Sequence, residues 1–355
     1  MKNIAILSFY SGVVERGVET FTLEISKRLA KNYNVTIFTA GPVLQQKFKV
    51  KEIKAFAKPP KSSKGILGKF YLDWQSLKIL LFTLRVLPVI FKNKYQVIIP
   101  LNGGWQIAVL RTFSKLSGSK ILVSGHAGIG SDDAWNLFFR PEVFVALTKT
   151  QSGWAKKLVP EVKTVVIPNG VDLSRFNPKV KPQDVSLPKP IIICASALVP
   201  YKRIDLTIKA VAKTKNLSLL VLGDGEEKGA IDTLGKRLLG KRYLRICAPY
   251  EKMPGYYRAG KVFSLASKTE AFGIAYVEAM ACNLPVVTTN DSSRAEIIGD
   301  VGILTNPSDS TQYAKDLEIT AKANYGNKPY AQALNFSWNN VAKKYADLIE
   351  KMLTK

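Results

Sequence analysis

The sequence predicts two α/β domains, each built on a doubly wound parallel sheet. Short apolar runs alternate with helical patterns along the whole chain, and a proline-bearing segment interrupts this alternation near the middle. A chain of 355 residues also exceeds what one ordinary hydrophobic core holds. Near-continuous Val, Ile and Leu runs are typical of parallel strands buried on both faces. We therefore expect two sheets of similar size that face a central cleft.

The first domain is expected at residues 1–172. Apolar residues at Phe21, Ile25 and Leu29 recur at helical spacing after the first strand. The strands are predicted at residues 3–8, 35–39, 96–100, 121–124, 143–147 and 163–167.

The second domain is expected at residues 173–335. Its beginning, 177–190, reads as a linker because it carries prolines and no apolar periodicity. Residues 336–355 contain an amphipathic helical pattern that we expect to cross back to the first domain. Strands are predicted at 191–195, 217–222, 244–246, 262–265 and 285–289, with helices at 204–212, 274–281 and 311–321.

The composition carries an unusually high positive charge. The formal net charge is +25, and residues 47–94 hold twelve Lys and Arg against Glu52 and Asp73. Such a field favours anionic partners, such as nucleic acid, anionic lipid or phosphorylated metabolites, although a solubilising surface is the alternative. Inside this run, residues 76–91 fit either an interfacial helix on an anionic membrane or a core helix of the first domain.

Cysteine and histidine are scarce, with three Cys, one His and no Cys-x-x-Cys pair. A disulfide framework and a Cys/His zinc site are therefore not expected, and the chain reads as a cytosolic protein. The first residues read as a buried strand rather than a signal peptide. The apolar stretch at 79–91 is shorter than the ~20 residues that span a bilayer.

The most informative stretch lies before and within the predicted helix at 274–281. The N–H groups of Phe272, Gly273 and Ile274 would point out of that helix N-terminus and form a phosphate site. Glu270 lies in the turn before this helix. Glu278 lies within the helix, roughly 7–8 Å from its N-terminus. One carboxylate can accept hydrogen bonds from sugar hydroxyls and the other from ribose hydroxyls, on either side of a diphosphate. A helix-start charge and a surface glutamate are the simpler alternative.

Glu270 and Glu278 match the Glu-x7-Glu motif of family 4 glycosyltransferases. The chain resembles that family over nearly all of its C-terminal half and at points in its N-terminal half. The resemblance implies the GT-B fold, with two Rossmann-like domains. Further matching segments are 167–172 (Ile-Pro-Asn-Gly-Val-Asp), 222–225 (Leu-Gly-Asp-Gly), 256–260 (Tyr-Tyr-Arg-Ala-Gly) and 279–287 (Ala-Met-Ala-Cys-Asn-Leu-Pro-Val-Val).

The resemblance assigns the catalytic roles to His126, Lys202 and Glu270. Lys202 lies in a Val-Pro-Tyr-Lys-Arg segment similar to the family's donor-phosphate loop, where it would neutralise the departing diphosphate. His126 follows a predicted strand, and the resemblance implies that it contacts the transferred sugar near the reacting carbon. Ala197 stands where the family usually has Arg, and Arg203 is the residue that could compensate. The simpler alternative is that Lys202 and Arg203 are exposed cations at a helix start.

The remaining predicted site residues would bind the donor. Only Gly17 of the family's glycine pair is present, because Arg16 occupies the other position; turn geometry is the alternative role for Gly17. Arg16 could read an acidic acceptor. The predicted donor-binding residues are Gly17, Arg203, Phe272, Gly273, Ile274 and Glu278, and no metal ligand is predicted because no Asp-x-Asp motif occurs.

The resemblance implies a retaining, metal-independent hexosyltransferase. It would move a hexosyl group from a UDP- or GDP-linked sugar, without a further cofactor, to a sugar or lipid-linked glycan acceptor in envelope polysaccharide or glycolipid synthesis. The acceptor would attack on the leaving-group face, and the departing phosphate would take its proton. We expect a cytoplasmic protein, with the anionic inner face of the cell membrane as a candidate partner and no nucleic acid.

Three other functions compete with this expectation. A GT-B epimerase or phosphorylase acting on a sugar (phospho)nucleotide is one of them, and it is distinguished by whether a sugar acceptor is consumed. A nicotinamide oxidoreductase would use the glycines at 223 and 225, but Gly229 comes one residue late for that fingerprint. A basic nucleic-acid-binding protein would explain the charge, but it lacks a recognisable reader motif and leaves Glu270 and Glu278 unexplained.

Overall fold

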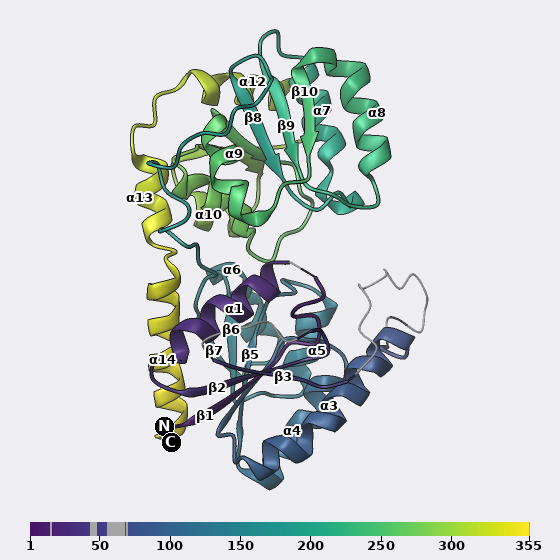
Figure 1. Ribbon diagram of the computed structural model, residues 1–355, viewed down its shortest axis with the longest axis vertical. Helices are drawn as coiled ribbons and strands as arrows, with labels where there is room; N and C mark the ends of the chain where they lie inside the picture. Colours follow the sequence, from purple (N-terminus) through teal and green to yellow (C-terminus); the bar gives the residue numbers. More distant parts are fainter. Residues whose placement is uncertain (15, 43–47, 55–67, 69, 355) are drawn as a thin grey trace. The chain divides into compact units, whose positions relative to one another are not determined.

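The computed structural model describes residues 1–14, 16–42, 48–54, 68 and 70–354 (Figure 1). Two compact units divide the chain. The first comprises Met1–Asn169 and Trp338–Lys355, and the second comprises Gly170–Ser337. Each unit contains one sheet in which all paired strands are parallel. The predicted class of two doubly wound α/β domains is confirmed.

The first unit is built on a seven-stranded sheet with the strand order β3-β2-β1-β4-β5-β6-β7. Successive strands are added on one side of β1 as far as β3, and on its other side from β4 onward. The switch point of this sheet therefore lies between β1 and β4. The strands are β1 Asn3–Leu7, β2 Asn34–Thr39, β3 Lys49–Glu52, β4 Val97–Pro100, β5 Lys120–Ser124, β6 Val143–Ala146 and β7 Lys163–Val166; the helices are α1 Gly17–Leu29, α3 Trp74–Lys92, α4 Trp105–Ser117, α5 Ser131–Phe138, α6 Lys149–Leu158 and α14 Trp338–Leu353.

Helices cover both faces of this sheet. Alternate residues of β1 point to opposite faces, so Ile4 and Ile6 join one core cluster while Ala5 and Leu7 join the other. The first cluster contains residues of α1 and α14, and the second contains residues of α3, α4, α5 and α6. Both faces are therefore buried, as the near-continuous apolar runs predict.

The C-terminal helix α14 is part of the first unit. Its Trp338 and Tyr345 are buried against Phe21 of α1, with ring centroids 6.1 and 5.5 Å apart. The Tyr345 hydroxyl also lies 2.8 Å from Ser124 Oγ at the end of β5. The yellow α14 runs beside the purple α1 in Figure 1. This packing uses the apolar face that the amphipathic pattern of residues 338–353 predicts.

The second unit is built on a six-stranded sheet with the order β10-β9-β8-β11-β12-β13, whose switch point lies between β8 and β11. Its strands are β8 Ile191–Ala195, β9 Ser218–Leu222, β10 Tyr243–Ile246, β11 Val262–Leu265, β12 Val286–Thr289 and β13 Gly302–Thr305. Its helices are α7 Ile204–Ala212, α8 Lys228–Leu239, α9 Met253–Ala259, α10 Ile274–Ala281, α11 Ser292–Ile298, α12 Ser310–Lys322 and α13 Lys328–Leu334, with 3-10 turns η1 Pro200–Lys202, η2 Gly240–Arg242 and η3 Tyr250–Lys252.

Several local expectations need correction. Strands β3 and β13 were not predicted, because β3 (Lys-Val-Lys-Glu) has a single apolar residue and β13 begins with a glycine. The segment at 177–190 is not an interdomain linker. It belongs to the second unit, where the backbone N–H of Gln183 donates a hydrogen bond to Gly255 O at 2.9 Å. Of the basic run at 47–94, residues 47, 55–67 and 69 lie outside the described residues.

Candidate functional site

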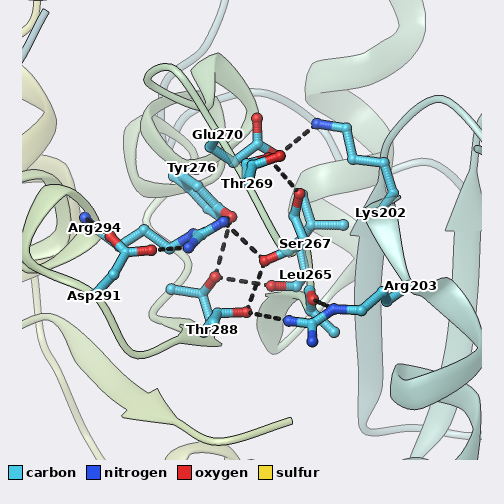
Figure 2. A network of polar contacts seen from close by, with 12 residues as sticks. Lys202, Arg203, Leu265, Ser267, Thr269, Glu270, Tyr276, Thr288, Asp291 and Arg294 are labelled. Atoms are coloured by element: carbon cyan, nitrogen blue, oxygen red, sulfur yellow. Dashed lines mark hydrogen bonds and ion pairs between the residues drawn. The ribbon is translucent and has the colours of Figure 1, made fainter. Parts of the chain in front are cut away.

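Lys202 and Glu270 meet at the switch point of the second sheet. Lys202 comes from η1, in the connection that follows β8, and Glu270 comes from the loop that follows β11. Their side chains form an ion pair with Lys202 Nζ 2.5 Å from Glu270 Oε1 (Figure 2). Both side chains are largely buried, at 14% and 11% exposed. The pair thus lies beyond the carboxyl ends of the two strands where an open α/β sheet binds its ligand.

The two loops that carry this pair are fixed by local chemistry. Pro200 occupies the first position of η1, where its fixed φ favours the turn. The Lys268 amide then donates to Tyr201 O at 2.8 Å, which ties the β11 loop to the β8 loop. Ser267 Oγ donates to Thr269 O at 2.9 Å and closes the turn before Glu270. These bonds hold both charged side chains in place before any ligand arrives.

Two arginines brace the same loop from beneath. Arg203 Nε donates to Ala266 O at 2.7 Å, and Arg294 donates through Nη2 to Ser267 O at 2.8 Å. Arg294, at the start of α11, is only 1% exposed and also pairs with Asp291, the N-cap residue of that helix. Figure 2 shows both guanidinium groups pointing at the backbone that follows β11. Direct contact of Arg203 with a donor stays a prediction, and its visible role is to brace the loop.

The N-terminus of α10 presents free backbone donors beside this ion pair. Gly273 caps the helix with φ of +83°, and a Cβ on it would lie 2.3 Å from the Tyr276 ring. Any other residue would therefore be strained and would clash. Within the described part of the chain, no group accepts a hydrogen bond from the N–H of Phe272, Gly273 or Ile274. Such free amides at a helix start suit a phosphate.

Glu278 lies on α10 and has a separate set of partners. Its carboxylate accepts hydrogen bonds from Tyr250 Oη at 2.7 Å and Tyr257 Oη at 3.0 Å. The residue is 6% exposed, and burial raises the pKa of its carboxyl, although the two tyrosines and the Arg175 charge act in the opposite direction. The carboxylate oxygens are thus oriented by two hydroxyl groups, which shows that the position can take hydroxyl donors.

His126 lies in the first unit, on the loop after β5. Its Nε2 is 3.0 Å from Ser124 Oγ, and its ring packs on Phe21 with centroids 4.3 Å apart. Burial lowers the pKa of His126 to about 3, so the imidazole is neutral at neutral pH. Gly17, the first residue of α1, lies four residues before Phe21 on the same helix. The neighbouring Arg16 caps α1 and pairs with Glu19 at 2.7 Å, so its cation is already engaged.

A buried polar network holds the loop that carries His126. Gln151 Nε2 donates to Gly125 O at 2.8 Å and to Asp133 Oδ2 at 3.0 Å. The same Asp133 oxygen accepts from the Gly128 amide at 3.0 Å. The loop at 125–128 is therefore fixed at both ends. Burial raises the pKa of Asp133 to about 7.

We expect Asp133→Asn to remove one component of the pH dependence of stability. Between about pH 4 and about pH 7, the folded state holds a proton on Asp133 that the unfolded state has lost. The free energy of unfolding therefore falls as the pH rises through this window and levels off above it. From about pH 5 to about pH 8, the free energy of unfolding should fall less in Asp133→Asn than in the wild type. The difference between the two falls should be on the order of 2 kcal/mol.

Tryptophan fluorescence is the appropriate readout for this prediction. All five tryptophans lie in the first unit, so urea titrations followed by their emission report its unfolding alone. Asp347→Asn, a change at an exposed aspartate of α14, is the matched control and should keep the wild-type profile. Parallel pH profiles for Asp133→Asn and the wild type would contradict the prediction.

Sequence reasoning did not identify Arg294 or Tyr250, and it included Tyr257 only within the family-like segment 256–260, without a role. The segment Asp291-Ser292-Ser293-Arg294 after β12 carried the one available signal, since an Asp cap followed by Arg at a strand's carboxyl end is a polar feature at the ligand edge. No local pattern predicted that the two tyrosines contact Glu278, because this contact depends on how η3 and α9 pack against α10.

Two family models together match most of the chain. The model described as Glycosyltransferase Family 4 matches residues 16–175, and the model described as Glycosyl transferases group 1 matches residues 177–330. The first range includes Gly17 and His126, and the second includes Lys202, Glu270 and Glu278.

Curated relatives match over parts of their length. A probable sucrose-phosphate synthase of Thermosipho melanesiensis is 32% identical over 212 residues, which is 54% of this chain and 49% of that protein. A GDP-mannose-dependent phosphatidylinositol monomannoside mannosyltransferase of Mycolicibacterium smegmatis is 26% identical over 42% of this chain and 44% of its own length. The chain thus spans about half or less of the length of these relatives.

Solved structures match over the whole chain. The sucrose-phosphate synthase of Thermosynechococcus elongatus superposes with a TM-score of 0.80 at 18% identity, covering 100% of both chains. Anabaena HepE in complex with UDP and glucose gives a TM-score of 0.78 at 18% identity, covering 99% of this chain and 100% of its own. At this identity the likeness concerns the fold. Taken together, these matches show that the chain belongs to glycosyltransferase family 4 and has the GT-B fold.

Proposed function

We propose that the chain is a retaining hexosyltransferase that binds a nucleotide-sugar donor at the switch point of its second sheet. The Lys202–Glu270 pair carries this proposal, because it places a cation beside the free amides of the α10 N-terminus. A diphosphate needs such a combination of charge and backbone donors. A carboxylate next to the cation supplies an acceptor for sugar hydroxyls.

Each of these groups has a place in the proposed transfer. The acceptor oxygen bonds to the anomeric carbon on the face that the diphosphate leaves, and the bond from that carbon to the phosphate oxygen breaks. The departing diphosphate takes the acceptor's proton, so the products are a glycoside and a nucleoside diphosphate. Lys202 and the amides of Gly273 and Ile274 stabilise the charge on the leaving phosphate, without a metal ion in this role. Glu270 binds sugar hydroxyls, and Glu278 binds the ribose.

The names of the matched proteins support UDP- or GDP-linked sugars as donors. HepE was crystallised with UDP and glucose, and the Mycolicibacterium smegmatis relative is GDP-mannose-dependent. That relative acts on a phosphatidylinositol mannoside, and we extend this to a lipid-linked or free glycan acceptor for the present chain. The proposed setting is envelope glycan or glycolipid synthesis at the cytoplasmic side of the membrane.

A donor panel tests this function. Purified chain, treated with EDTA, is incubated with UDP-, GDP-, ADP- and dTDP-linked hexoses, and release of the nucleoside diphosphate is followed with and without simple glycan acceptors. We expect release from one donor class, stimulated by acceptor, at a rate that Mg²⁺ does not raise more than about twofold. No release from any donor, or release only with added metal, would contradict the proposal. The anomeric configuration of the product, read by ¹H NMR, tests retention.

A further inference from the structure

Helix α3 has two apolar faces, of which the fold buries only one. Ile79, Phe82, Val86 and Ile90 pack into the core of the first unit. A second apolar stripe follows the spacing of one helix side and is exposed to solvent. Its members are Trp74 (70% exposed), Leu77 (38%), Leu81 (45%), Leu84 (44%), Pro88 and Phe91 (65%). At 1.5 Å per residue, the stripe runs along roughly 26 Å of the helix.

A row of cations runs along the edge of this stripe. Lys78, Arg85 and Lys92 follow one another at seven-residue spacing, and at about 100° per residue each lies beside the apolar stripe. Arg85 also donates to Lys54 O, in the connection that follows β3. An apolar stripe with a basic flank is the pattern of a helix that lies in the interface of an anionic bilayer.

The stripe continues onto the neighbouring helix α4. Helices α3 and α4 pack side by side (Figure 1), and the rings of Phe91 and Phe113 meet edge to face at 6.4 Å. Between the helices lies an open apolar groove of about 390 Å³, and Leu116 at its rim is 82% exposed. The groove is lined by Leu87, Ala108, Val109, Thr112, Phe113 and Leu116. A contiguous apolar surface of this kind marks an interaction site.

We propose that the α3–α4 face, defined by the exposed stripe of α3, its flanking cations and the α4 groove, docks the first unit onto an anionic phospholipid bilayer. The stripe residues enter the interfacial region, the cations lie at the headgroup phosphates, and the groove receives apolar acyl or side-chain surface. In this proposal both alternatives that the sequence left open for this segment apply, because α3 is a core helix on one face and an interfacial helix on the other.

Charge and packing favour this occupant over the others. A second copy seated on the same face would bring the cations of the two α3 helices together, which opposes association. Helix α3 is also long and apolar enough to cross a membrane, by length and composition alone. Its Phe82 and Val86 are fully buried in the first unit, so in this fold it lies along the domain surface rather than across a bilayer.

The test uses the full chain and lipid vesicles. Co-sedimentation is measured with pure phosphatidylcholine vesicles and with vesicles holding about 30% phosphatidylglycerol, at low and at high NaCl. Leu77→Ser/Leu81→Ser/Leu84→Ser removes the centre of the stripe, and Lys78→Gln/Arg85→Gln/Lys92→Gln removes its cations. Lys27→Gln/Lys31→Gln/Lys344→Gln removes the same charge from α1, its C-terminal end and α14, on the other side of the sheet.

We expect binding to the anionic vesicles at least about tenfold stronger than to phosphatidylcholine, and weaker at high salt. Both α3 variants should bind the anionic vesicles about tenfold or more weakly than the wild type. The affinity of the α1/α14 control should stay within about twofold of the wild type. With brominated phosphatidylcholine included in the anionic vesicles, emission should be quenched in the wild type, and most of this quenching should be absent in Trp74→Phe.

Three results would overturn the proposal: no binding to anionic vesicles, equal losses in the charge variant and its control, or a concentration-dependent dimer that the Leu variant abolishes while no vesicle binding occurs. The last result would assign the face to a second copy. Donor turnover in vesicle-free solution should be unchanged in all of these variants, so this proposal and the proposed function fail independently.

Discussion

Replacing Lys202 by methionine is expected to lower the turnover number about 10²–10³-fold. The ammonium lies at the switch point, 2.5 Å from Glu270 Oε1, where a leaving diphosphate would gain negative charge. Methionine keeps the length and apolar stem of the side chain but removes the charge that stabilises this state. Because the interaction strengthens as the bond breaks, the effect should appear in kcat more than in KM.

A second variant separates this effect from a loss of stability. Removing Lys202 alone leaves Glu270 as an uncompensated, largely buried carboxylate, which itself destabilises the loop. Lys202→Met/Glu270→Gln removes both charges and should restore the melting temperature without restoring turnover. Lys261→Met, at an exposed lysine beside the amino end of β11, is the matched control. A Lys202→Met enzyme that turns over within about twofold of the wild type would refute the assigned role.

Replacing Glu278 by glutamine is expected to weaken donor affinity by about 10–100-fold. A hydrogen bond to a charged group is worth about 1.5–3 kcal/mol, and about 1.4 kcal/mol corresponds to a factor of ten. Glutamine keeps the shape but halves the acceptor capacity offered to the ribose hydroxyls. The loss should appear as a higher dissociation constant in calorimetric titration with the donor identified by the panel. Glu318→Gln on α12 is the control.

The two tyrosines that hold Glu278 predict a graded effect. Tyr257 is fully buried, whereas Tyr250 is partly exposed to solvent. We expect Tyr257→Phe to weaken donor binding more than Tyr250→Phe, because the buried hydroxyl sets the direction of the carboxylate. Donor affinity should also fall as the pH drops through the raised pKa of Glu278, since the protonated form accepts fewer hydrogen bonds. The opposite order of the two tyrosine variants would contradict this account.

The strands and loops that carry the candidate site could be predicted from the sequence, whereas the contacts that hold them together could not. Buried parallel strands leave near-continuous apolar runs, so β8 and β11 and the residues after them could be read directly. That Lys202 and Glu270 touch depends on β8 and β11 being neighbours, and strand order is not encoded in any local pattern. An edge strand such as β3, which has three charged residues and one valine, lacks the apolar run altogether.

Helix α3 illustrates a different limit. Its periodicity predicted a helix, but the same residues at heptad spacing could face either a core or a membrane. The fold buries Phe82 and Val86 and leaves Leu81 and Leu84 exposed, so one face of α3 is a core face and membrane binding by the other face stays a proposal. The buried Arg294 shows the same dependence. Two of its partners, the Ser267 backbone oxygen and the Tyr276 hydroxyl, are brought to it only by tertiary packing.

A crystal structure of the chain with the nucleoside diphosphate of its donor tests the central claim most directly. The account predicts phosphate oxygens within hydrogen-bonding distance of Lys202 Nζ and of the Gly273 and Ile274 amides, with the ribose hydroxyls on the Glu278 carboxylate. A nucleotide bound elsewhere, with the Lys202–Glu270 pair and the α10 amides free of it, would contradict the account.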